Sequence, residues 1–160
     1  MPNVQKILFP MELVNLTGEI APWADLTARK FGAELHVLHV IPDPGYWGVA
    51  YGIDPSHLDD EPALLRKAEE SAGAFCKEHL GDDLNVSIKA VVGDPAEEIL
   101  RYIEDEAVSM VVIGTHARRG LERVFFGSVA DRVVKSSPVP VLTVNPHKKS
   151  ARSEERRVGK

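Results

Sequence analysis

Two glycines bracket a loop in the last third of this chain. Gly114 follows an apolar run at residues 110–113, and Gly127 and Ser128 end the loop. Valines recur at helical spacing after Ser128, so the sequence predicts a buried strand, a loop and then a helix. The first backbone N–H groups of a helix, together with the helix dipole, favour a bound anion. The pattern therefore predicts a phosphate-binding loop.

The elements that must position this loop alternate along the chain. Apolar runs bounded by glycine or proline predict strands, and the 3.6-residue period between them predicts helices. This alternation indicates an α/β fold, a single-domain open parallel five-stranded sheet with helices on both faces and right-handed crossovers. Strands are predicted at residues 6–10, 34–41, 85–92, 110–113 and 139–144, with helices at 17–31, 63–80, 95–106 and after Ser128.

The helix starts carry local signals. Asp94 is expected to be an N-cap, with Pro95 at the first helical position and Glu97 completing a capping box. Thr17 is expected to cap the first helix, which Gly32 ends. That helix is expected to bury one face, formed by Ile20, Ala24, Ala28 and Phe31.

The last strand contains a proline, Pro140, which cannot donate to a sheet ladder. The strand is therefore expected at an edge of the sheet. An apolar edge strand invites pairing unless something covers it. We expect a homodimer contact there, through Val139, Val141 and Thr143.

Ligands of open α/β sheets bind beyond the carboxyl ends of the strands, where the strand order reverses. Three loops should meet at that point, at residues 10–15, 40–43 and 114–128. The third would hold a phosphate, and the first two would flank a base or a ribose.

Several stretches together carry a family resemblance. The segments GDPAEEIL, VVIGTHARRGL and PVPVLTV, with the Gly127-Ser128 pair, resemble the universal stress protein (UspA-like) family over about residues 4–145. Nucleotide-binding members of that family carry glycine, two residues, glycine, nine residues, then glycine and serine or threonine. This chain keeps that spacing, with Ala117 in place of the second glycine.

The resemblance implies a Rossmann-like fold that binds ATP, ADP or AMP, the triphosphate together with Mg. Val40 would offer backbone hydrogen bonds to adenine, and Glu12 stands where the family has aspartate. If position 117 needs a positive φ, alanine there is strained by about 1 kcal/mol or more. The implied site residues are Pro10, Glu12, Val40, Gly114, Ala117, Arg118, Gly127, Ser128 and Val129.

Three alternative functions are consistent with these features. The first is a stress-response regulator that binds an adenine nucleotide, and the second is a dimeric interaction protein that binds none. The third and weakest is a slow ATPase, because GxxxxGK[ST], GxSxG and GxGxxG are all missing and Ser128 has no adjacent base. No metal site is expected either, because His36 and His39 fall on opposite faces of their strand.

The charge distribution limits the classes of partner that the protein is expected to bind. The chain carries −5 overall, while residues 147–160 carry six basic and two acidic residues, so the rest carries −9. An acidic body argues against nucleic acid as a partner. We expect one domain at residues 1–146 and an unfolded tail at 147–160, of which 152–160 resembles a translated sequencing adapter.

The cysteine count and the hydropathy pattern address the compartment. Cys76 is the single cysteine and falls in a helical pattern, so we expect it to be buried rather than reactive. No run is long enough to cross a bilayer, and no signal peptide is expected. A cytoplasmic protein without a membrane partner is the expectation.

Overall fold

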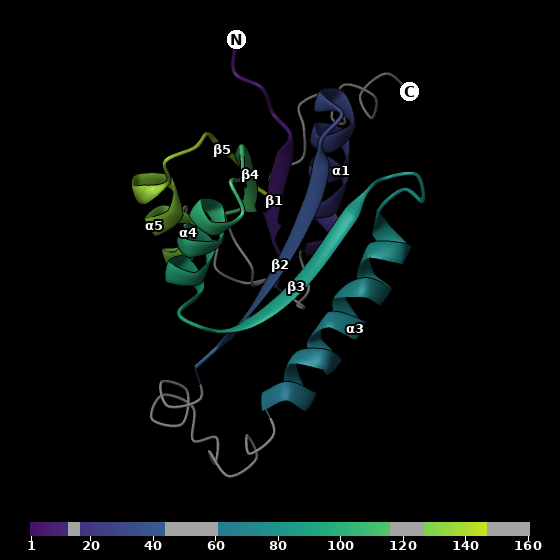
Figure 1. Cartoon of the computed structure of the whole chain (residues 1–160), viewed down its shortest axis with the longest axis vertical. Helices are drawn as coiled ribbons and strands as arrows, with labels where there is room; N and C mark the ends of the chain where they lie inside the picture. The colour runs from purple at the N-terminus through teal and green to yellow at the C-terminus, as the bar shows by residue number, and fades with distance from the viewer. Residues whose placement is uncertain (13–16, 44–60, 116–126, 147–160) are drawn as a thin grey trace, which may run out of the picture.

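The computed structural model describes residues 1–12, 17–43, 61–115 and 127–146. Within these ranges five parallel strands form one sheet in the order β3-β2-β1-β4-β5 (Figure 1), which confirms the predicted fold class. The strands are β1 (Lys6–Pro10), β2 (Glu34–Pro42), β3 (Val86–Gly93), β4 (Met110–Gly114) and β5 (Val141–Val144), and the helices are α1 (Thr17–Phe31), α3 (Glu61–His79), α4 (Pro95–Asp105) and α5 (Ser128–Ser136).

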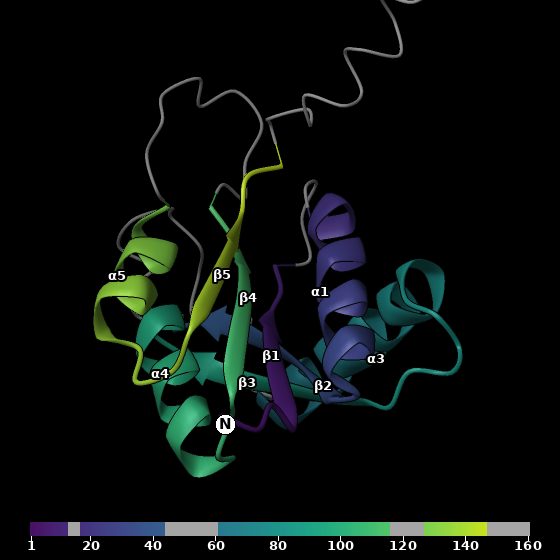
Figure 2. The same ribbon diagram turned by 90° about the horizontal axis from the view of Figure 1, so that it is seen from above.

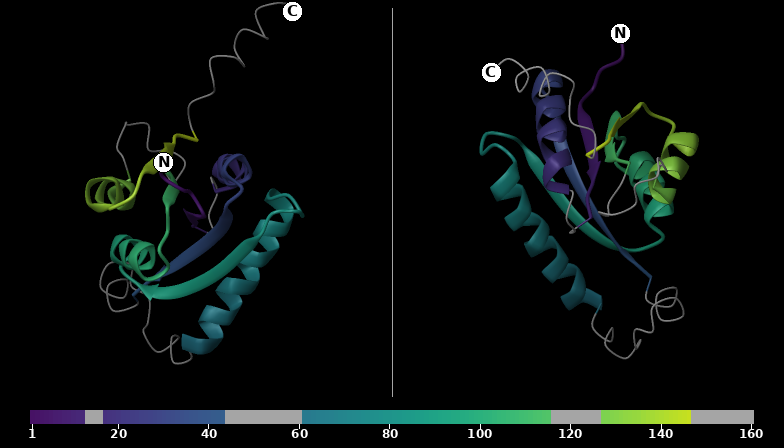
Figure 3. Two further views of the ribbon diagram at one scale, coloured as in Figure 1. Left: turned by 45° about the horizontal axis from the view of Figure 1, so that its top comes forward. Right: turned by 180° about the vertical axis from the view of Figure 1, so that it is seen from behind.

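The helices cover both faces of the sheet. Figure 2 shows α1 and α3 on one side of the strands and α4 and α5 on the other, and Figure 3 shows the same layers from two further directions. Alternate strand residues feed the two cores, because successive side chains point to opposite faces. In β4, Val112 packs with α1 and α3, whereas Val111 and Ile113 pack with α4 and α5.

The centre of the sheet is its most apolar part. The middle residues of β1 and β4, namely Ile7, Leu8, Phe9, Val111 and Val112, are completely buried. A strand covered on both faces needs a continuous apolar run, and the middle residues of those two strands form one. β5 lies at an edge of the sheet, as the proline predicted.

Three local expectations need correction. β5 begins at Val141, so Pro140 precedes the strand, and its carbonyl accepts from Val111 N–H (2.9 Å). Thr17 is the first helical residue of α1 rather than a residue before it, and its hydroxyl donates to the carbonyl of Glu12. Phe31 is 51% exposed, because the last turn of α1 extends past the core.

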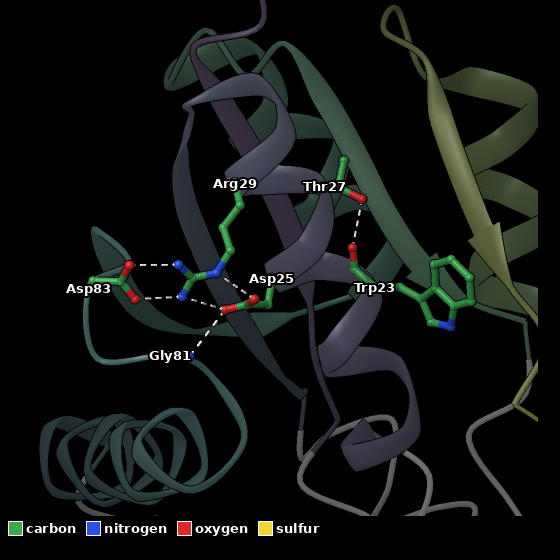
Figure 4. Close-up of polar contacts among 6 residues, drawn as sticks. All are labelled: Trp23, Asp25, Thr27, Arg29, Gly81 and Asp83. Atoms are coloured by element: carbon green, nitrogen blue, oxygen red, sulfur yellow. Dashed lines mark hydrogen bonds and ion pairs between the residues drawn. The ribbon is translucent and has the colours of Figure 1, made fainter.

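An ion cluster ties α1 to the turn between α3 and β3 (Figure 4). Arg29 donates two hydrogen bonds to Asp83 and also binds Asp25, whose carboxylate accepts from Gly81 N–H. The hydrogen bonds from Arg29 lower the pKa of Asp83 to about 2 and also lower the pKa of Asp25. The cluster is exposed, so it fixes the geometry of the turn more than it stabilises the fold.

Candidate functional site

The strand order reverses between β1 and β4, because β2 lies on one side of β1 and β4 on the other. The chain leaving β1 is fastened to β2 at this point. Met11 N–H donates to the carbonyl of Leu38 (2.9 Å), and His39 Nδ1 lies 2.9 Å from the carbonyl of Met11. A carbonyl only accepts, so Nδ1 of His39 carries the hydrogen. The first two predicted loops are therefore held together where they leave the sheet.

The two ends of the predicted phosphate loop are also joined. Gly127 N–H donates to the carbonyl of Thr115 (2.6 Å), and Thr115 N–H donates to the carbonyl of Val144 at the end of β5 (2.9 Å). Because of the first bond, the N–H of Gly127 points at protein rather than at a ligand. Of the backbone N–H groups at this end of the loop, the first that we expect to contact phosphate is therefore that of Ser128.

Gly127 is the N-cap of α5 and has no side chain to cap it. The first hydrogen bond of the helix runs from Asp131 N–H to the carbonyl of Gly127 (3.0 Å). In the part of the chain that the structure describes, the backbone N–H groups of Ser128, Val129 and Ala130 have no recorded acceptor. Three donors at the positive end of a helix dipole can bind an anion.

The two bracketing glycines serve different purposes. A Cβ on Gly114 would lie 2.1 Å from Cδ1 of Ile20, so this glycine lets α1 approach β4. A Cβ on Gly127 would lie 3.0 Å from the carbonyl oxygen of Thr115, so that glycine permits the close contact between the loop ends. Gly127 has φ −49° and ψ 142°, which any residue can adopt. Its role is therefore close approach and not unusual backbone geometry.

The remaining predicted site residues fall into two groups. Pro10 ends β1 and Val40 is buried in β2, while Glu12 is exposed and accepts the Thr17 hydroxyl through its carbonyl. The topology thus brings Pro10 and Glu12 to the same sheet edge as Gly114 and the start of α5. Ala117 and Arg118 lie outside the described residues.

Sequence reasoning did not identify a polar cluster at the opposite end of β2. His36 is buried, its Nδ1 lies 2.7 Å from the hydroxyl of Tyr102, and its Nε2 lies 3.3 Å from a carboxylate oxygen of Glu34. Burial, followed by the charges of Glu106 and Glu34, raises the pKa of Tyr102 to about 12. The two residues are 66 positions apart in the chain, so only the packing of α4 on β2 brings Tyr102 to His36.

Other predicted features have simple structural roles. Cys76 is buried, and burial raises the pKa of its thiol to about 11, so it is present as the thiol at neutral pH. His36 and His39 do lie on opposite faces of β2, as predicted. Within the described ranges no group of three or more His, Cys, Asp or Glu could hold a metal ion, and no helix is long and apolar enough to span a membrane.

Comparison with known proteins decides the family. The model of the universal stress protein family matches residues 3–145. The chain belongs to the universal stress protein family. Two relatives from Methanocaldococcus jannaschii are universal stress protein MJ0577, 34% identical over 88% of this chain and 94% of the relative, and universal stress protein MJ0531, 30% identical over 91% and 84%.

Solved structures agree with this assignment. The structure of MJ0577 matches with a TM-score of 0.69 at 28% identity, over 92% of this chain and 99% of that chain. Two more distant matches were solved with nucleotides. A universal stress protein in complex with cAMP has a TM-score of 0.58 at 20% identity, covering 90% and 98%, and one from Archaeoglobus fulgidus with dAMP has 0.54 at 17%, covering 89% and 98%. At these identities the last two support the fold alone.

Proposed function

We propose that this universal stress protein is a stress-response regulator that binds an adenine nucleotide, ATP, ADP or AMP, in the cytoplasm. The nucleotide would lie at the carboxyl edge of the sheet, with its base near Val40 and Glu12. Its phosphate would meet the N–H groups of Ser128, Val129 and Ala130, and a triphosphate would bring Mg.

The observation that carries this proposal is the start of α5. Three N–H groups there have no recorded acceptor among the described residues, and the N-cap is a glycine without a side chain to supply one. This helix begins beside the strand-order reversal, which is the place where α/β sheets bind ligands. The cAMP and dAMP complexes of distant family members make adenine nucleotides the first ligands to test.

Calorimetric titration with AMP and with Mg-ATP tests the proposal directly. We expect binding to the wild type and loss of binding in Gly127→Val, because a branched side chain would push against the carbonyl of Thr115. Gly73→Ala is a matched control, since a Cβ on Gly73 has an ordinary contact at 3.8 Å to Ile88. Folded wild-type protein that gives no heat at millimolar nucleotide would refute the proposal.

Two further variants test the positions at which this chain departs from the family pattern, Ala117 and Glu12. If Ala117 limits binding, as the sequence pattern predicts, Ala117→Gly should tighten the affinity for AMP. An unchanged affinity would show that the alanine is harmless to the site. Glu12→Asp restores the family's shorter side chain and should also tighten binding if the reach of the carboxylate matters.

We also propose that the chain forms a homodimer through β5. An open groove of about 470 Å³ lies between α1 and this strand, and Lys30 is the one charged residue among the described residues that line it. Figure 4 shows the ring of Trp23 extending from α1 toward β5. Large apolar side chains are exposed around the groove, namely Trp23, Leu26, Phe31 and Leu142.

The backbone of β5 offers a pairing edge beside the groove. The carbonyls of Pro140 and Val144 face β4, where they accept from Val111 and Thr115. Because strand residues alternate in direction, the N–H and C=O groups of Val141 and Thr143 face away from β4. A second copy of β5 would satisfy these groups and bring its own Leu142 to the groove, which makes a self-complementary two-fold contact.

Analytical ultracentrifugation tests the dimer. We expect the wild type to sediment as a dimer and Leu142→Lys to sediment as a monomer, because a charge in the apolar contact is costly to desolvate. Val134→Lys is the matched control. Val134 is similarly exposed (42% against 40% for Leu142) but lies on α5 and does not line the groove. A dimer that survives Leu142→Lys would contradict the proposed surface.

A further inference from the structure

We propose that Arg132 and Asp94 set the phosphate-charge preference of the nucleotide site. Arg132 attracts phosphate toward the start of α5, and Asp94 opposes it by competing for the same guanidinium. This inference rests on the proposed nucleotide-binding function. It concerns two side chains that are not among the site residues implied by the family resemblance.

The contact between the two residues joins separate helices. One guanidinium nitrogen of Arg132, Nη1, donates to both carboxylate oxygens of Asp94, at 2.9 Å and 3.1 Å. The other, Nη2, lies 3.7 Å from a carboxylate oxygen of Glu97. Asp94 also caps α4 by accepting from Glu97 N–H (2.9 Å), so its carboxylate has two partners at once. Arg132 is about half exposed and remains open to a further partner.

The position of Arg132 places its charge near the proposed phosphate. Arg132 is four residues after Ser128, so the two share one face of α5. Helix side chains lean toward the helix N-terminus, which brings the guanidinium toward the N–H groups of Ser128, Val129 and Ala130. Asp94 lies at the start of α4, which follows β3, so it occupies the same carboxyl edge of the sheet as the start of α5.

The charges of this cluster do not cancel. Asp94 and Glu97 contribute two negative charges against one positive charge on Arg132. A phosphate at the start of α5 therefore meets one attractive and two repulsive groups on its α4 side. Each added phosphate charge makes both the attraction and the repulsion stronger. The balance should tune the preference among AMP, ADP and ATP rather than the recognition of adenine.

The proposal predicts opposite signs for the two halves of one ion pair. Arg132→Met should weaken ATP binding by about 3–10-fold, and AMP binding by less, because it removes the attractive charge. Asp94→Ser should tighten ATP binding by about 2–5-fold, because it frees Arg132 and removes one repulsive charge while serine keeps the helix cap. A purely structural pair would instead make both variants weaken binding, since each breaks the same contact.

The experiment is calorimetric titration of AMP, ADP and Mg-ATP into the wild type and both variants, at low and moderate salt. Arg132→Lys is a rescue variant that should restore most of the ATP affinity. Arg101→Met is the matched control, because Arg101 is an exposed arginine on α4 paired with Glu98. It should leave the ATP-to-AMP affinity ratio unchanged. Circular dichroism confirms that each variant is folded.

The outcomes separate this inference from the function on which it rests. Wild-type protein that binds no nucleotide overturns both. Wild-type binding with the same direction of change in Arg132→Met and Asp94→Ser overturns the inference alone. Equal effects on AMP and ATP also overturn it, because a charge effect must grow with phosphate number. Opposite signs that shrink at higher salt support it.

Discussion

Helices α4 and α5 lie on the same face of the sheet and start at the same edge, yet they begin in different ways (Figure 2). α4 has an aspartate N-cap whose side chain accepts from the third residue of the helix. α5 has a glycine N-cap and no side-chain cap. A glycine N-cap costs only a few tenths of a kcal/mol relative to aspartate, and it leaves the first N–H groups of the helix without a side-chain acceptor at that position. The difference distinguishes a helix start used for stability from one available for binding.

We expect the largest effect when α5 is given an aspartate N-cap like that of α4. Gly127→Asp would place a carboxylate against the N–H groups of Val129 and Ala130, where it replaces and repels a phosphate. We expect nucleotide affinity to fall by about 100-fold. The thermal midpoint should change little, because the gain of a cap offsets the tight contact with Thr115. Titration calorimetry and a thermal melt measure the two effects, and unaltered affinity would remove α5 from the site.

The two glycines of the loop offer a second contrast. Gly114→Ala should destabilise the fold by about 1–3 kcal/mol, because the new methyl group overlaps Ile20 in the buried core. Ile20→Val in the same chain should recover part of that loss by removing the overlapping Cδ1. Urea denaturation of the two single variants and the double variant measures the coupling. Additive losses would show that Gly114 is not required for helix packing.

We expect a smaller difference in the free energy of unfolding when the starts of α4 and α5 are each changed to alanine. Asp94→Ala should lower the free energy of unfolding by about 1 kcal/mol, because it leaves the Glu97 N–H without its acceptor. Ser128→Ala should change it by less than about 0.5 kcal/mol, since Ser128 is an exposed first helical residue and Gly127 holds the capping position. Denaturant titrations compare the two. A larger cost at Ser128 would mean that the start of α5 is capped after all.

The smallest effect concerns Arg29, which ties α1 to the turn between α3 and β3 and lies away from the proposed site. Its hydrogen bonds lower the pKa values of Asp83, to about 2, and of Asp25, both from 3.8. Lowered folded-state values stabilise the fold above about pH 3.8, and that stabilisation is lost as pH falls toward 2. Arg29→Met should therefore lower the thermal midpoint slightly at pH 6 and by less at pH 2. Nucleotide affinity should not change, in contrast to Arg132→Met.

Much of the fold was predictable because its signals are local. Hydrophobic period, bounding glycines and the Asp94-Pro95 start depend on residues a few positions apart, so the sequence displays them directly. The edge position of β5 was also predicted, although the proline behind that prediction lies one residue before the strand. The exposure of Phe31 was not predictable, because helical spacing alone does not say where the last turn of α1 leaves the core.

The candidate site divides in the same way. The sequence by itself determined that a loop bounded by two glycines lies between a buried strand and a helix. Only the tertiary structure decided why Gly114 is a glycine, that Gly127 binds Thr115, and that Arg132 meets Asp94 across 38 residues of chain. Periodicity and capping are properties of neighbouring residues, whereas these contacts depend on how α1, α4 and α5 pack against the sheet.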